Sequence, residues 1–272
     1  MKKSTGYINR DTFLHRLNPA VKLFSLAFML IAAIILSKWY FLLALLLAVL
    51  IAFKTSQIPV GLTTARIRFL LTFSAFILVV QLIAVQNGVV IFHLFPSVGT
   101  IGPYFPVTTF GLERGLLFSL RFMLIVFSSK LFVAVTDPTL LAHALTDLGL
   151  SYRYSFALVI ALRFVPFFDI ETESVRMAQQ SRGFSPKIGS PSKLLRTIRM
   201  TFYPLLVSAL SKANSLTMSM DGRGFGYSKK RTYIRKSRWR TIDWLVLVLS
   251  MGLLFVSILL SIGLVPLHPL LR

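Results

Sequence analysis

The sequence predicts an all-α membrane protein with about five transmembrane helices and a cytoplasmic domain of three helices, two of them long. The composition points to a membrane protein, because 55% of the 272 residues are hydrophobic while the formal net charge is +21. Several apolar stretches are long enough to cross lipid, and a soluble basic protein that binds nucleic acid does not contain such stretches. Lys and Arg collect between these stretches, as they do in cytoplasmic loops of membrane proteins.

The first apolar region, Asn18–Phe53, begins with Asn-Pro, which is a helix N-cap followed by proline at the first helical position. As a single helix it would be much longer than a hydrocarbon core of about 30 Å. A turn at Ser37–Tyr40 would divide it into two helices. Three further spans are expected at Phe69–Val85, Leu112–Val135 and Trp244–Val265.

The distribution of charge favours two spans in this first region. With two spans, the basic Lys54–Arg68 connection is cytoplasmic and the Gln86–Gly111 loop, which has no Lys or Arg, is external. With one span these segments exchange sides, and the positive-inside rule is broken twice. Five spans, with a cytoplasmic N-terminus and an external C-terminus, are therefore expected. The cytoplasmic charges of the N-terminal segment are then Lys2, Lys3, Arg10, Arg16 and Lys22.

The same topology divides the chain into three parts: residues 1–135 with four spans, a cytoplasmic domain at 136–241, and residues 242–272 with the last span. The cytoplasmic part has helical apolar spacing over Leu140–Leu150, Tyr154–Gln180 and Ser192–Met220. These helices are too apolar for solvated surfaces and too charged to cross lipid. We expect them to lie against the membrane helices or a partner protein.

Two of these helices end in similar motifs, Ser181-Arg182-Gly183-Phe184 and Gly222-Arg223-Gly224-Phe225. One interpretation is a simple helix stop, because glycine accepts the left-handed cap and arginine complements the negative end of the helix dipole. Capping, however, requires neither the small residue before Arg nor the Phe after Gly. The alternative is that both helices present an arginine whose planar head binds a carboxylate of a partner.

Four further segments, together with these motifs, resemble the transmembrane T component of energy-coupling factor (ECF) transporters, the EcfT/CbiQ-like family. The segments are His15–Leu23, Ser119–Phe122, Thr136–Pro138 and Ala161–Pro166. The pattern of that family at the two motifs is Ala-Arg-Gly. Here Ser181 and Gly222 replace the alanine, and both are still small.

This resemblance implies a multi-pass protein of a prokaryotic plasma membrane that joins one substrate-binding S component to two ABC-type ATPases. The two motifs would be the ATPase-binding ends of coupling helices, and the imported substrate would be a vitamin or a metal ion. ATP and Mg would be bound by the partner subunits, so the chain itself would be neither an enzyme nor a holder of a cofactor. In agreement, the sequence contains no Gly-x-x-x-x-Gly-Lys-Ser/Thr loop.

Other residues permit less specific interpretations. Arg121 lies inside an expected span, where we favour a hydrogen bond between helices over a functional site. Pro166 and Pro204 are expected to kink the two long helices. The basic run Lys229–Arg240 is expected to anchor the chain at anionic lipid head groups, with nucleic acid a remote alternative.

Two other functions remain as alternatives. A self-sufficient secondary transporter would require inverted repeats and ionisable residues at the membrane midplane, and Arg121 alone meets the second condition. A membrane enzyme would require convergent acids or nucleophiles, whereas the nine Asp and Glu residues are dispersed. The four histidines are also scattered, so no metal site is expected.

Overall fold

The computed structural model describes residues 7–8, 10–57, 64–85, 87–95, 104–183, 191–227 and 239–262. Helices make up most of these residues, which confirms the all-α membrane fold. Contacts divide the chain into two compact units. We call Gly6–Asp137 together with Ser237–Arg272 the membrane unit, and Pro138–Lys236 the three-helix unit. The two units are described separately.

In its described part, the membrane unit contains five apolar helices and a short first helix. Their bounds are α1 Phe13–Arg16, α2 Pro19–Ile35, α3 Trp39–Thr55, α4 Thr64–Ala84, α5 Thr109–Val135 and α9 Thr241–Ile262. Within α4, α5 and α9 there are stretches long and apolar enough to cross a membrane, whereas α2 and α3 are shorter, with 17 residues each. The expected division of Asn18–Phe53 is confirmed, because the backbone becomes extended at Leu36 and helical again at Trp39. The number of spans stays a prediction.

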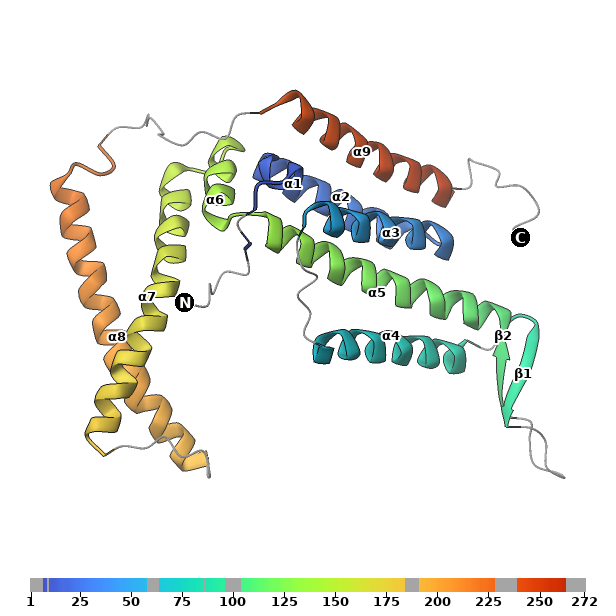
Figure 1. Cartoon of the computed structure of the whole chain (residues 1–272), viewed down its shortest axis with the longest axis horizontal. Coiled ribbons are helices and arrows are strands. Elements are labelled where there is room, and N and C mark those ends of the chain that lie inside the picture. Colours follow the sequence, from blue (N-terminus) through green and yellow to red (C-terminus); the bar gives the residue numbers. More distant parts are fainter. Residues whose placement is uncertain are drawn as a thin grey trace. The chain divides into compact units, whose positions relative to one another are not determined.

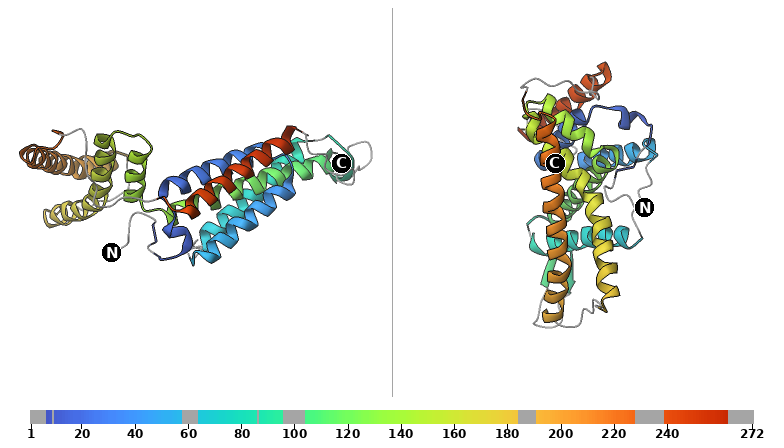
Figure 2. Two further views of the ribbon diagram at one scale, coloured as in Figure 1. Left: turned by 90° about the horizontal axis from the view of Figure 1, so that it is seen from above. Right: turned by 90° about the vertical axis from the view of Figure 1, so that its left-hand side faces the viewer.

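Helix α5 is the centre of the membrane unit, since it packs against α2, α3 and α4, while α9 packs against α2 (Figures 1 and 2). The buried face of α3 carries Leu42, Leu46, Val49 and Phe53, which follow one side of a helix. These side chains meet residues of α5 that include Leu124. The core therefore forms where two apolar stripes face each other.

Small residues bring α4 and α5 close together. Gly111, Gly115 and Ser119 are spaced four residues apart on one face of α5. A Cβ atom added at Gly111 would lie 2.9 Å from the carbonyl oxygen of Val85, just after α4, and one at Gly115 would lie 3.2 Å from that of Leu78. On the same face Ser119 is hydrogen bonded to Ser74 of α4. The stripe of small side chains therefore allows a close backbone approach.

A two-stranded hairpin lies in the Gln86–Gly111 segment, where the sequence predicts only a loop. Strands β1 (Val90–Phe95) and β2 (Tyr104–Thr108) pair antiparallel, with Val90 opposite Thr108 and an irregularity before Phe92. The two strands are rich in β-branched and aromatic residues, which favour extended backbone. Figure 1 shows the hairpin at the end of the membrane unit where α5 begins.

The three-helix unit consists, in its described part, of α6 (Pro138–Asp147), α7 (Tyr152–Ser181) and α8 (Pro191–Gly222). These bounds lie within two residues of the predicted ones, except at the end of α6. Helix α6 packs on α7, and α7 packs on α8. Figure 1 shows α7 and α8 as two long antiparallel helices that cross.

Candidate functional site

The first arginine motif forms the end of α7. Arg182 is the cap residue, and Gly183 follows with a φ of 77° and donates its N–H to the carbonyl of Gln180 at 2.9 Å. The hydroxyl of Ser181 donates back to the carbonyl of Met177 at 3.1 Å. Because this hydroxyl is used within the helix, serine behaves as a small residue here, as the alanine of the family pattern would. Phe184 lies outside the described residues.

The second motif ends α8 with the same geometry. Gly224 has a φ of 66° and donates to the carbonyl of Asp221 at 2.9 Å, and Phe225 donates to the carbonyl of Met220 at 3.0 Å. These two bonds define a Schellman cap, in which Arg223 is the cap residue. Gly222 is the last helical residue, and a Cβ added there would meet no atom within 4 Å.

The end of α6 shows that this cap does not require arginine. Gly149 has a φ of 105° and donates to the carbonyl of Thr146, while Leu150 donates to the carbonyl of Leu145. The residue at the position equivalent to the two arginines is Leu148. The helix-stop interpretation therefore explains the glycines but not the arginines.

Arg182 and Arg223 are both exposed, and within the described ranges the guanidinium group of neither forms a hydrogen bond or an ion pair. Each guanidinium carries five N–H donors in a rigid planar arrangement. At these two helix ends the chain thus presents donors that its own described residues do not use. The geometry suits a carboxylate or a carbonyl group of another protein.

The side chain of Phe225 has contacts within the chain. Its ring centroid lies 4.6 Å from that of Phe156 and 6.1 Å from that of Tyr152, both near the start of α7. The end of α8 is therefore held beside the start of α7. Since α7 has 30 residues, Arg182 lies about 40 Å along that helix from this contact. The two arginines accordingly mark opposite ends of the antiparallel pair.

Between these ends the two long helices make polar contact. Ser208 of α8 donates to a carboxylate oxygen of Glu171 on α7 at 2.8 Å, and the Lys212 ammonium lies 5.5 Å from the ring centroid of Phe167. Both helices continue through their prolines: Pro166 directly precedes Phe167, and Pro204 lies about one turn before Ser208. The expected kinks stay predictions.

In the membrane unit, Arg121 of α5 binds the end of α2. Its guanidinium donates to the carbonyls of Ala33, Ile34 and Leu36 at 2.9, 3.1 and 2.9 Å. These carbonyls belong to the last turn of α2 or follow it, where intrahelical donors are missing. The preferred interpretation, a hydrogen bond between helices, is confirmed. Arg121 serves as a C-terminal cap provided by another helix.

A second polar cluster in the membrane unit was not identified from the sequence. Asp243 accepts the backbone N–H of Asn18 at 2.9 Å with one oxygen and that of Arg240 at 2.7 Å with the other. Lys22 donates from Nζ to the carbonyls of His15 and Val135, each at 3.1 Å. We call Asn18, Lys22 and Asp243 the junction cluster.

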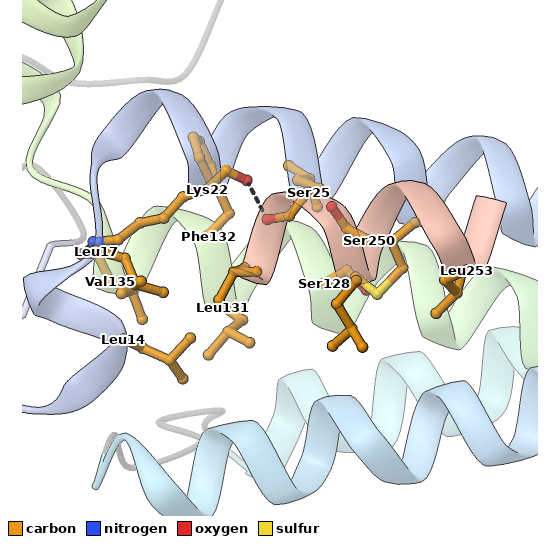
Figure 3. Close-up of a pocket in the computed structure, with 14 residues that line it drawn as sticks. Leu14, Leu17, Lys22, Ser25, Ser128, Leu131, Phe132, Val135, Ser250 and Leu253 are labelled. Atoms are coloured by element: carbon orange, nitrogen blue, oxygen red, sulfur yellow. Dashed lines mark hydrogen bonds between the residues drawn. The ribbon is translucent and has the colours of Figure 1, made fainter. Parts of the chain in front are cut away.

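The junction cluster is buried, with exposed fractions of 3% for Asn18, 8% for Lys22 and 1% for Asp243. Lys22 was expected only as one of the cytoplasmic charges of the N-terminal segment, and the structure buries it in the first turn of α2. Figure 3 shows its ammonium at one end of an apolar pocket, beside Leu17 and Val135. The sequence signal was the unusual pair of a lysine and an aspartate within the first turns of two apolar helices.

The segment before α2 also packs onto the end of α5. His15 donates from Nε2 to the carbonyl of Ile8 at 2.9 Å and its Nδ1 accepts from Thr12 at 2.7 Å, while Ile8 donates to the carbonyl of Ala134. Burial lowers the pKa of His15 below its ordinary value, with a smaller contribution from the positive charge of Lys22. Within the described ranges, no group of three or more His, Asp or Glu side chains could hold a metal ion.

Comparison with known proteins gives consistent matches. The family model described as cobalt transport protein, CbiQ, matches residues 10–234. The chain is 30% identical to the energy-coupling factor transporter transmembrane protein EcfT of Lacticaseibacillus paracasei, over 88% of this chain and 90% of that protein. It is 28% identical to the EcfT of Thermotoga maritima, over 91% of this chain and 90% of that protein. The chain is also 30% identical to the EcfT of Exiguobacterium sibiricum, over 78% of this chain and 81% of that protein.

Proposed function

The chain belongs to the CbiQ family, which includes the EcfT transmembrane proteins of ECF transporters, and from this premise we propose that it couples ATP-driven motion to substrate import. It would act as the membrane scaffold between two cytoplasmic ABC-type ATPases and one S component that binds a vitamin or a metal ion. ATP and Mg would be held by the ATPases. The three-helix unit and the N-terminus would face the cytoplasm.

The observation that carries this proposal is the pair of exposed arginines, one at the C-terminal end of α7 and one at that of α8. Because the helices are antiparallel, the two arginines lie at opposite ends of the pair. Their caps have the same backbone geometry, and the cap of α6 forms without an arginine. Two equivalent ends fit two equivalent partner subunits, each of which offers acceptors to one guanidinium. A secondary transporter working alone would have no use for such ends.

The contacts between α7 and α8 suggest how motion would pass between the two ends. Among the described residues, the helices make polar contact near Glu171 and Ser208, where a hydrogen bond and a cation–aromatic contact join them. Polar contacts of this kind permit a change in crossing angle at a lower cost than interdigitated apolar side chains. Movement of one end relative to the other would then change this crossing.

The test is affinity purification of the tagged chain from detergent together with its partners. We expect ABC-type ATPases to co-purify with the unmodified chain and to be lost from the double variant Arg182→Glu, Arg223→Glu. Arg176→Glu with Arg199→Glu is the matched control, because these residues are exposed on the same helices but away from the ends. The control pair should retain the ATPases.

Two results would count against the proposal. Absence of any ATPase from the purified unmodified chain would contradict the coupling function. Equal recovery of ATPases with the end variant and the control would leave the coupling function in place but exclude Arg182 and Arg223 as the contacts. ATP-dependent uptake into vesicles, with candidate S components added one at a time, would then identify the substrate class.

A further inference from the structure

Both connections between the membrane unit and the three-helix unit leave the membrane unit at the junction cluster. The first connection follows Val135, the last residue of α5, whose carbonyl accepts from Lys22. The second precedes Thr241, the first residue of α9, and here Asp243 accepts the N–H of Arg240. In sequence, the unit boundaries fall at Asp137, two residues after Val135, and at Ser237, three residues before Arg240.

The start of α2 joins the two connections. Lys22 and Asn18 both belong to the first turn of α2 or its cap, and Asn18 also accepts the N–H of Ala20 to complete that cap. Lys22 therefore holds the end of α5, while the backbone of Asn18 is held by Asp243 at the start of α9. One helix terminus thus binds two segments that lie more than 100 residues apart in sequence.

Burial of the charged side chains of the junction cluster carries a large desolvation cost, which argues that the cluster has a specific role. A buried lysine and a buried aspartate each lose hydration, and this loss is recovered only when their polar atoms are paired. Here Lys22 has two carbonyl acceptors, Asp243 has two backbone donors, and their opposite charges attract each other. Charged groups satisfied in this way specify one arrangement of the three helix ends.

We infer that Lys22 and Asp243 are positioning residues that tie both connections to the start of α2, so that α5 and α9 receive motion from the three-helix unit together. This role rests on the proposed coupling function. Without the tie, the ends of α5 and α9 would move independently, and the motion of the three-helix unit would be dissipated at the junction. ATP hydrolysis would then continue while uptake declined.

The test uses the full transporter with Lys22→Met and Asp243→Asn, which remove one partner each and keep similar side-chain size. Matched controls in the same unit are Lys38→Met, at a half-buried residue, and Asp11→Asn, at an exposed one. Because the chain has no cysteine, spin labels can be placed at Val133→Cys and Ile242→Cys, exposed positions near the two connections. Uptake per ATP hydrolysed is measured in proteoliposomes made from the same samples.

We expect the distance distribution between the labels to broaden in Lys22→Met and Asp243→Asn, and uptake per ATP to fall about tenfold, with the ATPases still bound. Lys22→Arg, which keeps the charge and the donors, should recover most of this loss, and the controls should behave like the unmodified chain. Unchanged label distances or unchanged uptake per ATP would overturn the inference. It would also be overturned if ATPase binding, the rate of ATP hydrolysis and the rate of uptake fell together and Lys22→Arg restored none of them. If the unmodified complex performs no ATP-dependent uptake, the proposed function fails, and the label distances alone decide whether the tie exists.

Discussion

The ring of Phe225, just beyond the end of α8, lies with its centroid 4.6 Å from that of Phe156 near the start of α7. This contact holds the backbone just after the exposed Arg223 beside the start of α7. Phe225 thus contributes to the second arginine motif by packing against its own chain.

Phe225→Ala is expected to loosen the end of α8. The loss of the aromatic contacts should cost about 1–2 kcal/mol of local stability, less than for a fully buried ring. Hydrogen–deuterium exchange should become faster in the last turn of α8. Tyr227→Ala is the control, because that side chain is 96% exposed and should leave exchange unchanged. Equal exchange in both variants would show that the contact does not hold the helix end.

The two glycines around Arg223 should respond in opposite ways to alanine. Gly222→Ala adds a Cβ in open space within a helix, so it should stabilise the last turn by about 0.5–1 kcal/mol. Gly224→Ala forces a φ of 66° on an L-residue and should cost about 1–2 kcal/mol. Exchange rates of the α8 end and ATPase recovery measure both effects. Stabilisation by Gly224→Ala would contradict the cap assignment.

The close approach of α4 and α5 predicts intolerance to larger residues on one face of α5. Gly111→Ala places a methyl group 2.9 Å from a backbone oxygen, so the helices must separate and the melting temperature in detergent should fall. Gly115→Leu should have a larger effect in the same direction. Gly252→Ala in α9 is the control, since its Cβ would meet no atom within 4 Å. A similar melting temperature for Gly111→Ala and Gly252→Ala would refute this packing.

Removal of Arg121 should destabilise the end of α2. Arg121→Met leaves the carbonyls of Ala33, Ile34 and Leu36 without this donor, at an expected cost of about 1–2 kcal/mol. Arg121→Lys should keep only part of the stability that Arg121→Met loses, because an ammonium group lacks the planar arrangement of donors. Thermal unfolding in detergent measures the difference. Arg114→Met is the control, as Arg114 contacts the Phe110 ring and would be expected to change stability less.

Stability should fall in mild acid because of His15. Its pKa is lowered in the folded protein, so the unfolded chain binds a proton more readily. The contribution of His15 is therefore fully present above about pH 6.5 and is lost as the pH falls through the folded-state pKa. Melting temperatures at pH 7.5 and pH 5 should differ less in His15→Gln than in the unmodified chain. An equal or larger pH dependence in His15→Gln would exclude this residue as the cause.

Local sequence patterns were sufficient for the long helices, for the start of α2 and for the ends of α7 and α8, whereas α4 begins five residues before its expected start at Phe69. Apolar stretches of about 20 residues, the Asn18-Pro19 start and the glycines after α7 and α8 each act within a few residues of the backbone, so they can be recognised without a fold. The hairpin in the Gln86–Gly111 segment was not predicted, because strand pairing depends on residues that lie apart in the sequence.

The sequence by itself determined the membrane class, the division of Asn18–Phe53 into two helices, and the two arginine motifs with their glycine caps. Only the tertiary structure decided that Phe225 packs on Phe156, that Arg121 caps α2, and that Lys22 and Asp243 are buried where α2, α5 and α9 meet. The physical reason is that hydrophobicity and capping are properties of short segments. The role of a buried polar side chain, in contrast, depends on its hydrogen-bond partners, and these are backbone groups that lie far away in the sequence and are brought close only by the fold.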